Sequence, residues 1–250
     1  MDIEKAIKEF DNYVNNFDIN NSRVKYKYYH SKRVSVICGD IAKSLNLSDE
    51  EIMVAKILGL LHDIGRFNQV KKHDSFLDSK TLDHGEEGVR ILKTNNYIRK
   101  YLAINNYDDI IYTAINNHNK KFISKVNDEK ALLFSKIIRD ADKIDILYAV
   151  SSLDYITLDN KYSEEVIQLV KKGEQIDIYK VKYKTDDIAF KLGFVNDINF
   201  LPSLKMIKEK GYVDKIMSKL IIKDDKIKEV LEDISTGINR AIKKKLGGYR

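Results

Sequence analysis

Apolar residues recur at helical spacing from the start of the chain. Intervals of three and four separate the first five of them, which are Ile3, Ile7, Phe10, Val14 and Phe17. This spacing places the side chains on one face of a helix. The chain is therefore predicted to open with an amphipathic helix. A second helix is predicted over about 22–45 because the same pattern returns there, with His30 in line with the aliphatic residues.

A capping signal marks the start of the third predicted helix. Ser48 and Glu51 form an S-x-x-E capping box, in which each side chain can bond the backbone of the other residue. The helix is predicted to run through Leu61 and to end at Gly65. Residues 66–82 follow neither a helical nor a strand period and are rich in polar residues, which predicts a long loop.

A histidine or an aspartate lies at the start or on the apolar face of each of the next three predicted helices. Asp83 and Glu86 repeat the capping pattern, so a helix is expected from His84 to about residue 93. His118 continues the helical spacing of Ile111, Ala114 and Ile115. In a further helix over about 128–149, Asp142 points in the same direction as its apolar neighbours.

The pattern changes after residue 150, where no histidine occurs. Helices are expected near residues 163–172, 186–195, 203–210, 212–221 and 225–245. Residues 175–183 alternate apolar and polar side chains, which favours a short strand or an extended crossing over the helices. We expect an all-α fold: a helical bundle over 1–150, and a C-terminal helical extension over 151–250 packed on the same core.

Composition narrows the class of protein. A hydrophobic content of 43% fits a folded globular chain, and 11 glycines with the single Pro202 exclude collagen and flexible linkers. The lone Cys38 excludes a disulfide framework and a multi-cysteine zinc site, and its place on an apolar helix face predicts a buried, inert thiol. With neither a secretory signal nor an apolar run long enough to cross a membrane, a cytoplasmic location is predicted.

Four histidines and two aspartates lie at predicted helix ends or on inward faces. They are His30, His62, Asp63, His84, His118 and Asp142. A single inward histidine is usually an ordinary core residue, but several buried imidazoles and carboxylates need a common partner. A divalent transition metal fits, and nitrogen with oxygen ligands suits Fe, Mn, Co, Ni or Zn. Because no thiolates are available, the site is expected to be catalytic.

The order of these residues carries the most specific signal. His30 precedes the His62-Asp63 pair by 32 residues, and Asp142 comes later on a separate predicted helix, followed by Lys143. This order, together with the segments LLHDIGRF and RDADKIDIL, resembles the HD superfamily of metal-dependent phosphohydrolases over roughly residues 22–150. The resemblance implies that residues 1–150 form an HD-domain helical bundle, and that His30, His62, Asp63 and Asp142 hold a metal ion. Asp140 and Asp145 are competing candidates for the last ligand.

Two further histidines match the binuclear branches of that superfamily. His84 and His118 lie between the His-Asp pair and Asp142. The resemblance implies that they hold a second metal ion, with Asp63 bridging the two. A solvent-facing cap residue at His84 and an ordinary core histidine at His118 are the alternatives, so one or two metal ions remain open.

Phosphate chemistry also needs cationic side chains. Arg66, just after the His-Asp pair, and Lys143, beside Asp142, are the candidates for catalysis and substrate binding, and Arg33, near His30, is a third candidate for binding. Each of them can instead be an ordinary surface cation. His73 matches no ligand position and is interpreted as a surface residue.

The function expected from this resemblance is hydrolysis of a nucleotide or related small phosphate ester or diester by a metal-bound hydroxide, with Asp63 orienting the nucleophile. Alternatives are an HD-type nuclease acting on single-stranded nucleic acid and a catalytically silent nucleotide-binding sensor. A cyclic-dinucleotide phosphodiesterase of the HD-GYP type is disfavoured because its G-Y-P element is absent. The expected partner is a small anionic phosphate compound and not a membrane. Homo-oligomer formation is left open.

Overall fold

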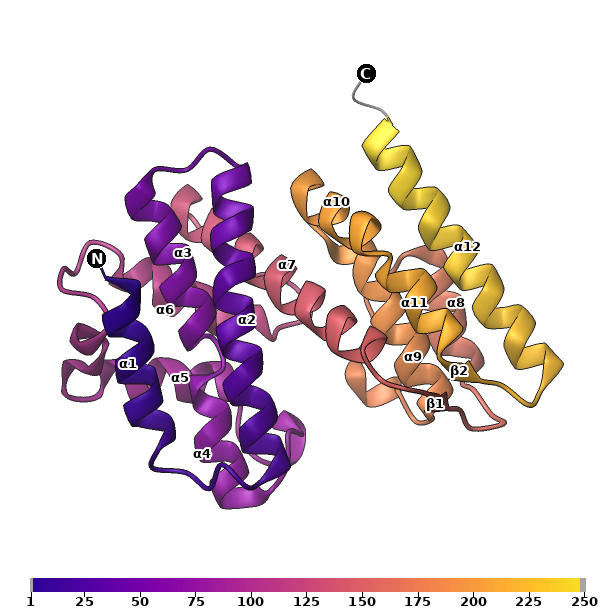
Figure 1. The fold of residues 1–250 in the computed structure, drawn as a ribbon, viewed down its shortest axis with the longest axis horizontal. Coiled ribbons are helices and arrows are strands. Elements are labelled where there is room, and N and C mark those ends of the chain that lie inside the picture. Colours follow the sequence, from indigo (N-terminus) through magenta and orange to yellow (C-terminus); the bar gives the residue numbers. More distant parts are fainter. Residues whose placement is uncertain (1, 248–250) are drawn as a thin grey trace. The chain divides into compact units, whose positions relative to one another are not determined.

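The computed structural model describes residues 2–247 and is built almost entirely of helices (Figure 1). The predicted all-α fold is therefore confirmed. Contacts divide the chain into two compact units, Met1–Asp142 and Lys143–Arg250. The helix α7 (Glu129–Ser151) contains the boundary between them. The packing of a C-terminal extension on the N-terminal core stays a prediction.

Seven helices and two 3₁₀ turns make up the N-terminal unit through α7, among the residues that the structure describes. The elements before α7 are α1 (Ile3–Val14), α2 (Ser22–Ser44), α3 (Asp49–Leu61), α4 (Ile64–His73), η1 (Asp78–Lys80), α5 (His84–Lys93), η2 (Thr94–Lys100) and α6 (Asp108–His118). Figure 1 shows α2 and α3 running side by side, with α1 against α3. The core between these helices holds completely buried side chains such as Phe10, Val34 and Leu58.

Side-chain caps fix where several of these helices begin. The Ser48 side chain accepts from the Glu51 amide, and the Glu51 carboxylate accepts from the Ser48 amide, which confirms the capping box. Asp83 caps α5 in the same way by accepting from the amides of Gly85 and Glu86. These bonds satisfy amide groups that have no partner inside the helix.

The predicted loop over 66–82 is wrong in its first half, because residues 64–73 form the helix α4. Its inward face includes Ile64, Phe67 and Val70 at steps of three, while the basic residues of its last turn, 71–73, are exposed. The Phe67 ring packs against aromatic rings of α1, including Phe10 at 5.8 Å between centroids. Burial of this short apolar face outweighs the polar composition that suggested a loop.

Gly65 lies inside α4 and does not end α3, which corrects the predicted boundary. A β-carbon at this position would lie 2.2 Å from the backbone oxygen of His84 and 2.8 Å from the backbone nitrogen of Gly88. Only glycine therefore lets α4 and α5 approach this closely. The close approach brings His84, the first residue of α5, beside the start of α4.

The C-terminal unit is helical as well, with one pair of two-residue strands. Its elements after α7 are β1 (Ile156–Thr157), α8 (Glu164–Lys172), η3 (Ile178–Lys180), α9 (Lys184–Gly193), η4 (Phe194–Asp197), α10 (Leu201–Lys210), α11 (Tyr212–Ser218), β2 (Leu220–Ile221) and α12 (Asp225–Gly247). The strands pair in parallel, Ile156 opposite Leu220. Residues 175–183 form an irregular segment with one 3₁₀ turn, so the strand suggested there is wrong and the extended crossing fits better.

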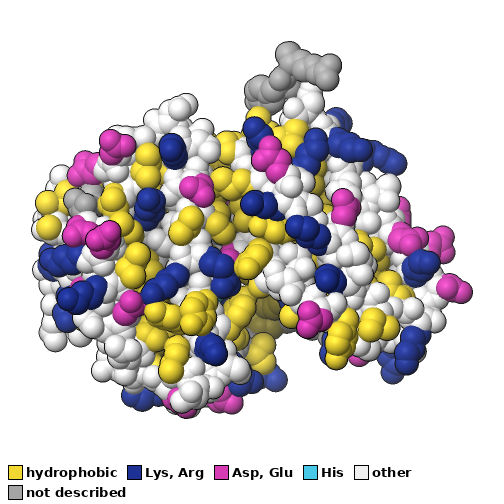
Figure 2. All heavy atoms as spheres, viewed as in Figure 1, with side chains coloured by type: hydrophobic (Ala, Val, Ile, Leu, Met, Phe, Trp, Pro, Cys, Tyr) yellow, Lys and Arg dark blue, Asp and Glu magenta, His cyan; other side chains and the backbone are white. Residues whose placement is uncertain are grey.

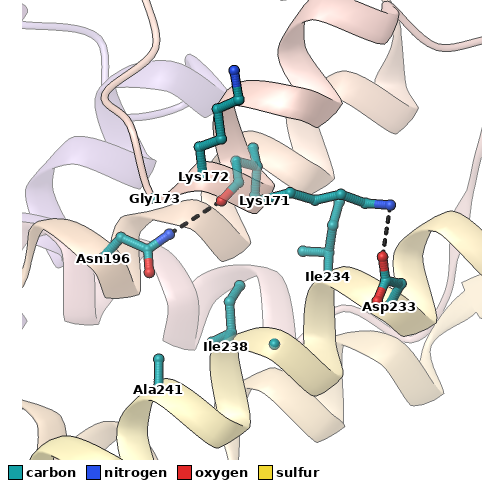
Figure 3. Close-up of a pocket in the computed structure, with 10 residues that line it drawn as sticks. Lys171, Lys172, Gly173, Asn196, Asp233, Ile234, Ile238 and Ala241 are labelled. Carbon is teal, nitrogen blue, oxygen red and sulfur yellow. Dashed lines mark hydrogen bonds and ion pairs between the residues drawn. The ribbon is translucent and has the colours of Figure 1, made fainter.

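A hollow of about 400 Å³ lies between α8 and α12 within the C-terminal unit (Figure 3). Ile234 and Ile238 contribute apolar side chains to its wall. Lys171 pairs with Asp233 at its rim, 2.6 Å between Nζ and Oδ2. Its lining contains neither histidine nor more than one carboxylate, so the hollow lacks the donors of a transition-metal site.

No helix in residues 2–247 has both the length and the apolar character needed to cross a membrane. The cytoplasmic location stays a prediction.

We expect Gly65→Ala to destabilise the protein by about 1–3 kcal/mol, because the added methyl group collides with the backbone of α5. Urea unfolding followed by circular dichroism measures the change. Gly237→Ala in α12 is the matched control, since its added methyl group would meet nothing within 4 Å. The control should be neutral or stabilising by about 0.5–1 kcal/mol. Equal stability of Gly65→Ala and the wild type would contradict the close approach.

Candidate metal centre

The six side chains proposed as ligands come from four helices and from the junction between two further helices. His30 lies on α2, the His62-Asp63 pair joins α3 to α4, His84 opens α5, His118 ends α6 and Asp142 lies on α7. The four histidines and Asp63 are at most 5% exposed. The Asp142 side chain is 19% exposed. The fold therefore brings the six side chains that were singled out from the sequence into one buried cluster.

One group forms around the Oδ2 atom of Asp63. His30 Nε2 and His62 Nε2 lie 3.4 and 3.3 Å from this oxygen, and 3.2 Å from each other. Asp142 Oδ1 closes the group at 3.1 Å from His30 Nε2 and 3.8 Å from His62 Nε2. Two imidazoles and two carboxylates thus face a common point.

A second group forms around the other oxygen of the same carboxylate. His84 Nε2 and His118 Nε2 lie 3.3 and 3.6 Å from Asp63 Oδ1, and 3.0 Å from each other. Asp63 therefore presents one oxygen to each histidine pair. This is the arrangement that a bridging carboxylate between two cations would have.

Hydrogen bonds on the opposite ring nitrogens fix which nitrogen faces inward. His62 Nδ1 lies 2.8 Å from the Gly59 oxygen, and His118 Nδ1 lies 2.6 Å from the Ile115 oxygen. A carbonyl oxygen can only accept, so each Nδ1 donates and each Nε2 carries a lone pair when the ring is neutral. His84 Nδ1 lies 2.6 Å from Asp78 Oδ2, so this nitrogen also donates and leaves the lone pair on Nε2.

The donor set fits divalent cations. Lone pairs of two imidazoles at 3.0 Å repel one another unless a positive charge lies between them. Ligands about 2.1 Å from one ion are about 3.0–3.4 Å apart in octahedral or tetrahedral geometry, and the separations in both groups cover this range. His30, His62 and Asp63 form one compact ligand group, and Asp63, His84 and His118 form the other.

Charge around the centre keeps the carboxylates ionised. Burial opposes ionisation of Asp63, but the Lys27 ammonium and the neighbouring imidazoles outweigh it and hold its pKa well below the usual range. Burial likewise opposes ionisation of Asp142, and hydrogen bonds from His30 and His62 hold its pKa well below the usual range. Both side chains are therefore anionic near neutral pH, as cation ligands must be.

The second group contains a neutral histidine. Burial, together with the positive charge of Arg66, lowers the pKa of His84 to about 3. Its ring is therefore uncharged over the whole physiological pH range, which leaves its Nε2 lone pair available to a cation.

Asp78 is a residue of the site that sequence reasoning missed. Its Oδ2 atom accepts from His84 Nδ1, and Asn119 donates to the same oxygen at 3.1 Å. Its Oδ1 atom accepts from Arg66 at 2.7 Å and from Gln69 at 2.9 Å. Asp78 thus orients the His84 ring. A carboxylate partner for the outer nitrogen of a ligand histidine is common, but nothing in the sequence marks Asp78 among so many charged residues.

Lys27 is the second missed residue. Its ammonium lies 2.5 Å from Asp63 Oδ2, with the side chain 12% exposed. It precedes His30 by one turn of α2, and its ammonium lies 5.5 Å from the centre of the Phe76 ring. The spacing of three residues before a candidate ligand is the only sequence signal that could have singled it out.

The three cations proposed from the sequence occupy different surroundings. Arg66 Nη1 donates to Gln69, to the backbone oxygen of Phe76 and to Asp78, while its buried Nε lies 3.6 Å from Asp63 Oδ1 and has no hydrogen-bond partner among the described residues. Arg33 is half buried on α2.

Lys143 belongs to the C-terminal unit, where its ammonium pairs with Asp197 at 2.7 Å. The predicted catalytic and binding roles of Arg66, Lys143 and Arg33 stay predictions. Outside the centre, His73 is exposed in the last turn of α4 and Cys38 is completely buried, as expected for both.

Comparison with known families identifies the fold around these side chains. Residues 28–147 match the family model described as the HD domain. This range contains all six candidate ligands, and Lys27 lies one residue before it. Neither the curated proteins nor the solved structures contain a significant match to the chain.

We expect Asp78→Asn to weaken the binding of one Co²⁺ ion by about 10–100-fold, because the amide no longer supplies the charge that orients His84. Titration of the metal-stripped chain, followed by visible absorption, measures both binding constants. Asp74→Asn is the control, because this exposed carboxylate pairs with Arg23 of α2 at 3.0 Å and accepts from the N-cap residue Asn21, and neither is a candidate ligand. Unchanged Co²⁺ affinity in Asp78→Asn would show that Asp78 does not support the second group.

Proposed function

The N-terminal part of this chain belongs to the HD domain family, and we propose that the protein is a metal-dependent phosphohydrolase acting on a nucleotide or related small phosphate ester or diester. The observation that carries the proposal is the division of the Asp63 carboxylate between two pairs of imidazoles. Binuclear centres of this kind suit in-line displacement at phosphorus, because they neutralise both the attacking and the leaving oxygen.

In the proposed centre, His30, His62, Asp63 and Asp142 would hold one cation, and Asp63, His84 and His118 would hold a second. Fe, Mn, Co, Ni and Zn are all compatible with these nitrogen and oxygen donors. When bound, the cations supply the positive charge that activates water and polarises the phosphoryl group. Asp63 orients both pairs because each of its oxygens is shared between two rings.

The chain itself contributes positive charge beside the centre. The Lys27 ammonium and the Arg66 guanidinium flank the Phe76 ring, at 5.5 and 5.4 Å from its centre. Both side chains lie next to Asp63 and are largely buried, with 12% of Lys27 and 14% of Arg66 exposed. The unpartnered Nε of Arg66 is a donor suited to a phosphate oxygen. We therefore assign phosphate binding to Lys27 and Arg66, ahead of Lys143 and Arg33.

The alternative functions have less support. A nuclease on single strands would favour a continuous basic groove with interleaved aromatic rings, whereas Figure 2 shows Lys and Arg interspersed with Asp and Glu over the face drawn. A silent nucleotide sensor does not need a full set of cation ligands, and here all six candidate side chains are retained. Hydrolysis of a small, anionic phosphate compound is the better supported proposal.

Replacement of His62 or Asp63 by alanine should abolish phosphate release, because each removes a proposed cation ligand. Inorganic phosphate released from nucleoside mono-, di- and triphosphates, and nucleotide released from phosphodiesters, is measured with added Mn²⁺. His73→Ala is the matched histidine control and should retain wild-type activity, since His73 is exposed at the end of α4. Full activity of Asp63→Ala with wild-type metal content would refute the proposed mechanism.

Lys27→Met should lower kcat/KM about ten- to a hundredfold, since a charge-assisted bond to phosphate contributes roughly 1.5–3 kcal/mol. Steady-state kinetics on the best substrate of the panel measures the loss. Lys25→Met, an exposed lysine on the same helix, should leave kcat/KM unchanged. Arg66→Ala is a less specific test, because it also removes the hydrogen bond from Arg66 to Asp78. Unaltered kinetics in Lys27→Met would leave Arg66 as the only phosphate-binding cation of the pair.

A further inference from the structure

Arg139 is a buried arginine that the proposed mechanism does not use. It lies on α7, one helical turn before Asp142, and is 4% exposed. Burying a guanidinium costs several kcal/mol unless its charge and its N–H groups find partners. The partners of Arg139 therefore show what the fold requires of it.

The guanidinium faces a row of backbone oxygens at the end of α6. Nη1 donates to the oxygens of Asn117 and His118, at 3.1 and 3.4 Å, and to that of Lys120. Nη2 donates to the oxygen of Lys121 at 3.2 Å. The last carbonyl groups of a helix have no partner within the helix and carry partial negative charge. Arg139 thus supplies both the donors and the charge that this helix end needs.

The clamped backbone carries one ligand of the second group, His118, and the neighbouring Asn119, which supports another ligand indirectly. His118 presents Nε2 to His84 and Asp63, and its Nδ1 bond to Ile115 ties the ring to the same last turn of α6. The next residue, Asn119, donates to Asp78, the carboxylate that orients His84. A shift of this turn would therefore move both imidazoles of the second group.

The first group touches this turn where the His62 ring packs against the His118 ring, at 5.1 Å between centroids, but its own rings are held by other elements. His30 is on α2 and His62 on α3, and the His62 ring is held by the Gly59 oxygen within its own helix. A displaced α6 end would leave these contacts in place. The two ligand groups thus differ in the support that Arg139 gives them.

We propose that Arg139 is a positioning residue that holds the end of α6, and with it His118 and Asn119, in the place required for the second cation. The inference rests on the binuclear centre of the proposed function. Arginine is suited to this task because its planar fork reaches several acceptors at once, whereas a lysine ammonium would reach fewer in a fixed geometry.

Co²⁺ titration of the metal-stripped full-length chain tests the proposal, using Arg139→Met, Arg139→Lys and Arg99→Met. Arg139→Met should weaken one of two Co²⁺ binding constants at least tenfold and change the other less than threefold. Arg139→Lys should fall between Arg139→Met and the wild type. Arg99 pairs with Asp108 at the opposite end of α6, so Arg99→Met should change stability but neither binding constant. Circular dichroism confirms that each variant is folded at the titration temperature.

A double-mutant cycle assigns the weakened site. His118→Ala should remove the same binding constant that Arg139→Met weakens, so the two changes together should have no greater effect than His118→Ala alone. Hydrogen exchange of the metal-free protein gives a readout without any cation. In Arg139→Met, peptides covering residues 117–124 should exchange at least tenfold faster, because the Asn117 side chain no longer holds the Ser124 amide in a fixed turn.

The outcomes separate the two proposals. A wild-type chain that binds fewer than two Co²⁺ ions would refute the binuclear centre, and the role of Arg139 would fall with it. A wild type with two sites and a folded Arg139→Met with both constants unchanged would overturn the role of Arg139 alone. Equal weakening of both constants would also overturn it, since that result indicates a general structural role. If Arg139→Met does not fold, the same comparison is made with Arg139→Lys.

Discussion

One buried carboxylate, shared between two pairs of imidazoles, is the interaction on which the N-terminal unit depends. Asp63 is 1% exposed, and both of its oxygens face ring nitrogens. A buried charge costs several kcal/mol unless its surroundings compensate it on every side. The positions of the helices that end or begin at this carboxylate must therefore be closely fixed. This requirement explains why Gly65 permits backbone contact between α4 and α5 and why a buried guanidinium holds the end of α6.

Helix ends, more than helix faces, build the candidate centre. His62 and His118 each bond the carbonyl oxygen three residues earlier, in the last turn of α3 and of α6. Those carbonyls would otherwise lack a partner within the helix. The same bond thus completes the helix and turns the other ring nitrogen toward the centre. Histidine at the end of a helix serves here both the local backbone and the geometry of the site.

The clustering of the candidate ligands could be anticipated from the sequence because imidazoles and carboxylates are rare on apolar helix faces, and His30, His118 and Asp142 follow that apolar spacing. Their role as metal ligands stays a prediction. The HD family match covers all three. Asp78 and Lys27 could not be found in this way, since a third of the chain is charged and only the folded backbone brings them to the ligands. The helix α4 was missed because its apolar face has only three residues, and their burial depends on partners far away in sequence.

The single thiol of the chain gives the N-terminal unit a built-in reporter. Cys38 is completely buried, and burial, with help from the nearby Asp142 and Asp140, raises its pKa well above the usual range. The reactive thiolate is therefore almost absent in the folded state. Alkylating reagents can modify this sulfur only when α2 separates from its neighbours, so the rate of modification measures how often the surroundings of His30 open. The same seclusion keeps the sulfur from competing with nitrogen and oxygen ligands for soft cations during reconstitution.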